Sequence, residues 1–123
     1  MVVFYIEDDN DDVELFKDAI SSINPSIVCL TAHNGIEALE LLETNILMPD
    51  YIFIDINMPL MNGIETLKAI KANLKWKNIS VVMISTSVNP KDVQECLELG
   101  ASSFFTKPNS IEDYVKILEG ALA

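Results

Sequence analysis

Apolar residues gather in five short runs along the chain, and these runs predict five strands. They cover residues 2–6, 27–32, 51–54, 79–84 and 103–106. Most are nearly continuous and rich in β-branched and aromatic residues, whereas a strand with one face in water alternates apolar and polar positions. We therefore expect strands that are buried on both faces, as in a parallel sheet covered by helices from either side.

After each run, apolar residues recur every three to four positions, which indicates five amphipathic helices. Their expected ranges are 13–23, 36–43, 64–73, 90–99 and 110–122. This regular alternation, without a linker or repeat, predicts one α/β domain over residues 1–123 with an open, doubly wound parallel sheet. In such sheets ligands bind beyond the carboxyl ends of the strands.

Several helix ends carry residues that favour capping. Asn10 or Asp11 is placed to cap the first helix, and Asn89 followed by a proline favours the start of the fourth. Ser110 and Asp113 have the spacing of a capping box at the start of the fifth. The sequence therefore indicates where these three helices begin.

The same periodicity gives expectations for packing around the third helix. Leu67, Ile70 and Leu74 share one face, so we expect all three to be buried. Trp76 follows among polar residues, so we expect its side chain to be partly exposed.

The charge balance argues against two classes of partner. The 123 residues include 19 acidic and 8 basic side chains, all of the latter lysines, for a net charge of −11. Nucleic-acid binding calls for a basic patch, usually with arginine, and anionic membrane surfaces attract basic segments. We therefore expect neither nucleic acid nor a membrane surface as a partner.

The chain shows no pattern for secretion or membrane insertion. No apolar run approaches the roughly 20 residues of a spanning helix, and the N-terminus lacks the basic start of a signal peptide. Cys29 and Cys96 belong to no Cys-x-x-Cys pattern and are interpreted as free thiols. We expect a soluble, cytoplasmic protein.

Polar side chains that could bind a ligand or take part in a reaction stand at the ends of the predicted strands. Glu7 and Asp8 follow the first strand, Asp55 ends the third, Ser85 follows the fourth and Lys107 follows the fifth. Because parallel strands end at the same edge of a sheet, we expect these groups to share one pocket.

Charge arithmetic indicates what such a pocket could hold. Glu7, Asp8 and Asp55 carry −3 and Lys107 carries +1, so a bound Mg²⁺ brings the total to zero. A dianionic phosphoryl group on Asp55 changes the total to −1 with the metal and to −3 without it. The pocket is therefore suited to an aspartyl phosphate when Mg²⁺ is present.

Four separated motifs together resemble the receiver domain of bacterial two-component response regulators. They are Ile-Glu-Asp-Asp-Asn-Asp-Asp at 6–12, Phe-Ile-Asp-Ile-Asn-Met-Pro-Leu-Met-Asn-Gly at 53–63, Met-Ile-Ser-Thr-Ser at 83–87 and Gly-Ala-Ser-Ser-Phe-Phe-Thr-Lys-Pro at 100–108. The resemblance covers essentially the whole chain. It implies a flavodoxin-like fold with five strands in the order 2-1-3-4-5 and five helices.

The resemblance also implies roles for the residues that would accept the phosphoryl group and bind the metal. Asp55 corresponds to the phosphoacceptor of the family. Glu7 and Asp8 correspond to its acidic metal-binding pair, with Asp8 as the direct Mg²⁺ ligand and Glu7 acting largely through water. Asn57 stands where a backbone carbonyl completes the coordination, and Asp55 itself is the remaining ligand.

Four further positions correspond to the switch machinery of the family. Ser85 and Lys107 match the hydroxyl and the ammonium that contact the phosphoryl group. Phe104 stands where many members have an aromatic switch residue. The Lys107–Pro108 bond matches a position that is commonly cis, although cis is the minority state for bonds that precede proline.

These features predict a single-domain response regulator rather than an enzyme acting on a free substrate. A histidine kinase or histidine phosphotransfer protein would phosphorylate Asp55, and the surface of the fourth helix, fifth strand and fifth helix would then bind a downstream protein. One rival hypothesis is an aspartate-nucleophile phosphohydrolase, which needs Asp-x-Asp where this chain has Asp55-Ile-Asn57. A second is a degenerate receiver that acts only as an interaction module, and a third is a receiver that belongs to a longer regulator.

Overall fold

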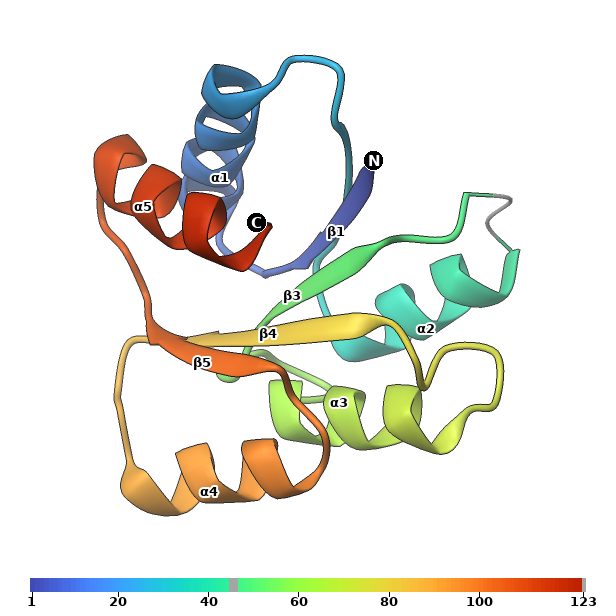
Figure 1. The fold of residues 1–123 in the computed structure, drawn as a ribbon. Helices are drawn as coiled ribbons and strands as arrows, with labels where there is room; N and C mark the ends of the chain where they lie inside the picture. The colour runs from blue at the N-terminus through green and yellow to red at the C-terminus, as the bar shows by residue number, and fades with distance from the viewer. Residues whose placement is uncertain (45–46, 123) are drawn as a thin grey trace.

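The computed structural model describes residues 1–44 and 47–122 and consists of a parallel sheet between two layers of helices (Figure 1). The strands are β1 (Val2–Ile6), β2 (Val28–Ala32), β3 (Tyr51–Asp55), β4 (Ser80–Ser85) and β5 (Ser103–Thr106). The helices are α1 (Asn10–Ile23), α2 (Gly35–Thr44), α3 (Gly63–Ala72), α4 (Pro90–Glu98) and α5 (Ile111–Ala121). The sheet order is β2-β1-β3-β4-β5 with every pair parallel, which confirms the predicted fold.

Both faces of the sheet are buried, because α1 and α5 cover one face and α2, α3 and α4 cover the other (Figure 1). Alternate residues of β1 therefore enter different cores. Val3 and Tyr5 pack with Phe16 of α1 and Leu118 of α5, whereas Phe4 belongs to the core on the opposite face. None of the helices within the described residues has the length and apolarity needed to cross a membrane.

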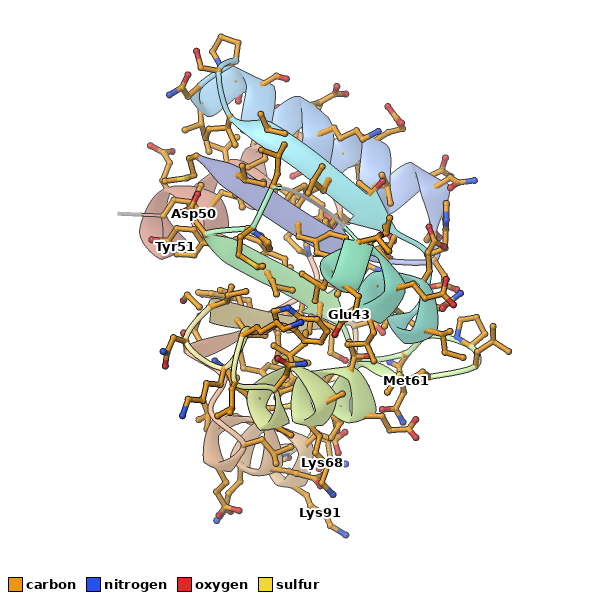
Figure 2. The ribbon with its side chains drawn as sticks, turned by 90° about the vertical axis from the view of Figure 1, so that its right-hand side faces the viewer. Glu43, Asp50, Tyr51, Met61, Lys68 and Lys91 are labelled. Carbon is orange, nitrogen blue, oxygen red and sulfur yellow. The ribbon has the colours of Figure 1, made fainter. Side chains whose placement is uncertain are left out.

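The carboxyl ends of the strands meet at one edge, where the site-bearing loops lie. Figure 2 shows Asp50 and Tyr51 at the edge where β3 begins and Met61, in the loop after β3, at the opposite edge. Gly63 begins α3 close to that second edge, and its N–H donates to the carbonyl of Ile56 at 2.8 Å. The helix is thus held directly against the end of β3.

The helix starts differ from the predictions at two places. Asp9 caps α1, because its Oδ1 accepts the N–H groups of Asp11 at 2.9 Å and Asp12 at 3.2 Å. The prediction of Asn10 or Asp11 was therefore wrong by one or two residues, since the chain needs fewer residues than expected to turn from strand to helix. Asn62 forms a capping box at the start of α3, which was not predicted.

The predicted caps of the last two helices are confirmed. Asn89 caps α4 and Pro90 is its first residue, where the missing N–H of proline costs no helical hydrogen bond. Ser110 caps α5 by accepting the N–H of Asp113 at 3.2 Å, which is one of the two hydrogen bonds of the predicted capping box; the return bond from the Asp113 side chain is not formed.

The segment after α3 reverses the predicted packing of two residues. Leu74 is 81 % exposed and Trp76 only 4 %. The helix ends at Ala72, so the apolar face that Leu67 and Ile70 share does not extend to Leu74. A turn brings Trp76 into the core instead, where its indole buries more apolar surface than a leucine would.

The Lys107–Pro108 peptide bond is trans, so the prediction of a cis bond is wrong. No peptide bond within residues 1–44 and 47–122 is cis. The trans form is the lower in energy for bonds that precede proline, and here it is compatible with a 2.7 Å hydrogen bond from the Lys107 N–H to the Ser85 carbonyl.

The contact between Gly63 and β3 predicts a strong effect of adding one methyl group. A Cβ at Gly63 would lie 2.4 Å from the Asp55 carbonyl oxygen and 2.7 Å from the Ile56 Cα, so backbone would have to move. Gly63→Ala should lower the free energy of unfolding in urea by about 2–3 kcal/mol. Gly120→Ala is the control, because a Cβ there meets nothing within 4 Å, and stability should be unchanged or up to about 1 kcal/mol higher. Equal effects of the two substitutions would contradict this contact.

Candidate functional site

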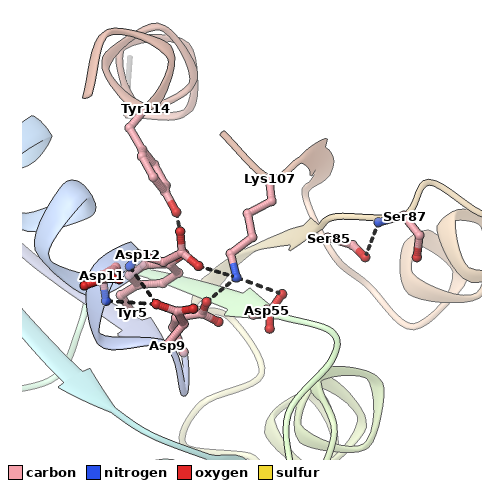
Figure 3. A network of polar contacts seen from close by, with 10 residues as sticks. Tyr5, Asp9, Asp11, Asp12, Asp55, Ser85, Ser87, Lys107 and Tyr114 are labelled. Carbon is pink, nitrogen blue, oxygen red and sulfur yellow. Dashed lines mark hydrogen bonds and ion pairs between the residues drawn. The ribbon is translucent and has the colours of Figure 1, made fainter. Parts of the chain in front are cut away.

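The structure brings most of the predicted site residues to one end of the sheet. Glu7 and Asp8 follow β1, Asp55 ends β3, Ser85 ends β4 and Lys107 follows β5. The close view in Figure 3 shows the Lys107 side chain reaching across this edge toward the ends of β1 and β3. The parallel order of the strands produces this convergence, since β1 and β3 are neighbours and β4 lies next to β3.

Three carboxylates form a cluster with the dimensions of a metal site. Glu7, Asp8 and Asp55 each offer an oxygen, and these oxygens all lie within 4.8 Å of one another. Glu7 is 0 % and Asp55 3 % exposed, whereas Asp8 is exposed. The buried Glu7 Oε2 has no hydrogen-bond partner in the described part of the chain. An unpartnered buried carboxylate oxygen beside two further carboxylates fits a hard divalent cation.

Lys107 is held by acids from two elements. Its Nζ donates to Glu7 Oε1 and lies 2.7 Å from Asp12 Oδ2 and 3.9 Å from Asp55 Oδ1 (Figure 3). Its side chain is only 10 % exposed. The ammonium therefore offsets the negative charge of several buried or half-buried carboxylates at once.

Asp12 is a site residue that the sequence pattern did not predict, because acids at the start of a helix commonly belong to a solvated turn or cap. One signal was present, since Asp12 lies four residues before the buried Phe16. Residues at that spacing share a helix face, so its side chain begins on the face of α1 that packs against the sheet.

The electrostatics of the site reflect burial and the crowding of like charges. Burial and the neighbouring Asp55 carboxylate raise the pKa of Glu7 to about 9, although Lys107 opposes the shift. Burial also raises the pKa of Asp55. Burial alone would lower the pKa of Lys107, but its hydrogen bonds to Asp12 and Glu7 and the charges of the nearby acids together raise it. In the absence of a cation the site thus favours a proton on one carboxyl group and a charged lysine.

Three other predicted residues lie outside this cluster of carboxylates. Ser85 is buried at the end of β4, and its Oγ accepts the Ser87 N–H at 3.3 Å (Figure 3). Asn57 lies in the loop after β3 with an exposed side chain. Phe104 pairs with Met83 in the sheet and packs, half-buried, against the core below α2, α3 and α4. Their roles stay predictions.

A hydroxyl pair lies in the core close to the cluster. The hydroxyl groups of Tyr5 in β1 and Tyr114 in α5 are 2.9 Å apart and buried (Figure 3). Burial raises the pKa of both hydroxyls, that of Tyr114 to about 12 although its hydrogen bond with Tyr5 opposes the shift, so both hydroxyls are neutral. The pair satisfies two polar groups in an otherwise apolar core and links β1 to α5.

Residues 3–119 match the family model described as "Response regulator receiver domain". The chain is 31 % identical to response regulator Rcp1 of Synechocystis, over 97 % of this chain and 84 % of Rcp1. It is 39 % identical to a protein-glutamate methylesterase/protein-glutamine glutaminase of Methanococcoides burtonii, over 82 % of this chain and 28 % of that protein. The chain spans only 15 %, 28 % and 50 % of the length of three curated relatives that it matches.

Solved structures of response regulators are also similar to this chain. The phosphorylated cyanobacterial phytochrome response regulator RcpA has a TM-score of 0.90 and 29 % identity, covering 99 % of this chain and 94 % of RcpA. The Mn(2+)-bound form of Rcp1 has a TM-score of 0.86 and 29 % identity, covering 97 % of this chain and 89 % of Rcp1. The cluster at the carboxyl edge of the sheet is thus found in a chain that belongs to the receiver-domain family of two-component response regulators.

Proposed function

We propose that Asp55 accepts a phosphoryl group from the phosphorylated histidine of a histidine kinase or histidine phosphotransfer protein in the cytoplasm. The observation that carries this proposal is the position of the Asp55 carboxylate. It ends β3 in one cluster with Glu7 and Asp8, and its Oδ1 lies 3.9 Å from the Lys107 ammonium, which also binds Glu7. Acids able to hold a cation and a positively charged side chain thus both adjoin the Asp55 carboxylate, and phosphoryl transfer needs positive charge from both sources.

The transfer is a single displacement at phosphorus. An Asp55 oxygen forms the new O–P bond while the N–P bond to histidine breaks, and the electron pair stays on the histidine nitrogen. The Lys107 ammonium and the Ser85 hydroxyl then bind oxygens of the phosphoryl group. These contacts hold the product and offset its charge.

Mg²⁺ is the cofactor that we propose for this reaction. Glu7, Asp8 and Asp55, with the backbone carbonyl of Asn57, would hold it, and the three-carboxylate cluster supports this assignment. The Mn(2+)-bound form of Rcp1 is consistent with a divalent ion in a receiver of the same fold. When bound, Mg²⁺ supplies positive charge next to the transferred group.

We propose that phosphorylation acts on a downstream protein through the surface formed by α4, β5 and α5. Phe104 in β5 would move with Ser85, because the two lie on adjacent strands near the same end of the sheet. We assign no turnover of a free substrate beyond the protein's own phosphorylation and dephosphorylation. The family match over residues 3–119 favours this function over a phosphohydrolase, and the complete set of acids, hydroxyl and lysine favours it over a degenerate receiver.

The phosphoacceptor role predicts a single modified residue. With Mg²⁺ and acetyl phosphate, the wild type should gain one phosphoryl group that is labile to base and hydroxylamine, as seen by intact-protein mass spectrometry. Asp55→Asn keeps the shape of the side chain but removes the nucleophile, so the gain should disappear. Asp11→Asn is the control and should react like the wild type. Stoichiometric phosphorylation of Asp55→Asn would contradict the assignment.

The metal assignment predicts a specific loss of affinity. Asp8→Asn removes one of three clustered charges at an exposed position, so the fold should persist. Calorimetry should show Mg²⁺ binding that is roughly tenfold weaker or more. Asp11→Asn removes an equal charge outside the cluster and should change the affinity far less. Equal losses of affinity in the two variants would contradict the metal assignment, because Mg²⁺ binding would then depend only on the overall charge of the protein.

A further inference from the structure

Asp12 contacts the site but has no part in the function proposed so far. Its Oδ2 lies 2.7 Å from Lys107 Nζ, and its side chain is 20 % exposed. The Asp9 cap fixes its backbone, because Asp9 Oδ1 accepts the Asp12 N–H at 3.2 Å. The side chain is therefore anchored in the first turn of α1 and aimed at the lysine.

The partners of Lys107 show what Asp12 does to the site. Glu7 and Asp12 each accept a hydrogen bond from the ammonium, whereas Asp55 Oδ1, at 3.9 Å, lies beyond hydrogen-bond distance. The lysine is thus bonded to two acids other than the nucleophile. These two acids use two of the three N–H donors of the ammonium, so a group on Asp55 would have to share its charge with them.

Glu7 and Asp12 differ in how firmly they keep the lysine once a cation binds. Glu7 belongs to the three-carboxylate cluster, so a cation there would neutralise its charge. Asp12 is not a member of that cluster, so a cation bound there would not neutralise it directly. It then remains the main competitor for the ammonium.

We propose that Asp12 is a positioning residue, which binds Lys107 in the unphosphorylated protein and competes for it with the phosphoryl group on Asp55. This inference rests on the proposed function of Asp55. The competition sets how much of the protein holds a phosphoryl group under given conditions. Phosphorylation would then also affect the structure. When Lys107 moves from Asp12 to the phosphoryl group, the ion pair that joins α1 to the segment after β5 is weakened.

The test measures binding of beryllium fluoride, a stable phosphoryl analogue, at saturating Mg²⁺. Asp12→Asn removes the competing charge but keeps the size of the side chain, and it should tighten binding roughly fivefold, as expected for a partly buried ion pair. Asp11→Asn is the matched control, because it removes an equal charge from the same helical turn with no ion pair to Lys107. It should leave the affinity near that of the wild type.

A double-mutant cycle tests whether Asp12 acts through the lysine. In a Lys107→Ala background, Asp12→Asn should change the affinity no more than Asp11→Asn does. A gain that persists without the lysine would overturn the inference, as would unchanged or weaker binding by Asp12→Asn in the wild-type background.

A second readout does not depend on phosphorylation. In metal-free protein, reductive methylation of Lys107, followed by peptide mass spectrometry, should be several-fold faster in Asp12→Asn than in the wild type or in Asp11→Asn. Equal rates would overturn the inference whatever the function of Asp55. If the rates differ as expected but the wild type binds no beryllium fluoride and accepts no phosphoryl group, the proposed function fails and the competition fails with it.

Discussion

The chemistry of this protein depends on one ammonium group placed among four carboxylates. Lys107 lies within 4 Å of Glu7, Asp12 and Asp55, and Asp8 is the third carboxylate of the cluster with Glu7 and Asp55. With all four acids ionised, they and the lysine carry a net charge of −3, which a divalent cation reduces to −1; without the cation, a proton on one carboxyl group offsets part of it. The site therefore favours the binding of positive charge, and in the function proposed above Lys107 and a cation share the charge of Asp55 and of its phosphoryl group.

The fold keeps these charged side chains close together by placing each of them at or next to the end of a rigid strand or helix. The strands β1, β3 and β4 are buried on both faces, so their ends have little freedom. Gly63 holds α3 against the end of β3, and the Asp9 cap fixes the first turn of α1. Acids that repel one another are thus held close by packing and hydrogen bonds elsewhere, not by their own interactions.

The hydrophobic pattern predicted the strands, the helices and the residues at strand ends, because burial on both faces leaves a clear pattern and parallel strands end at one edge. The sheet order came from the resemblance to receiver domains. The sequence did not predict features that depend on three-dimensional distance. The role of Asp12 was missed, since its partner Lys107 is 95 residues away along the chain. Trp76 was misplaced because polar neighbours in sequence do not reveal the core that a turn brings it to. The trans bond before Pro108 corrects an expectation carried over from the family.

A crystal structure of the protein with Mg²⁺ and beryllium fluoride would test the central claim most directly. We expect the analogue on Asp55, a cation bound by Glu7, Asp8 and Asp55, and Lys107 Nζ within hydrogen-bond distance of a fluorine. The same structure should show Nζ farther from Asp12 than the present 2.7 Å. An analogue bound at another residue, or one on Asp55 with Lys107 still fully paired to Asp12 and out of reach of the fluorines, would contradict the claim.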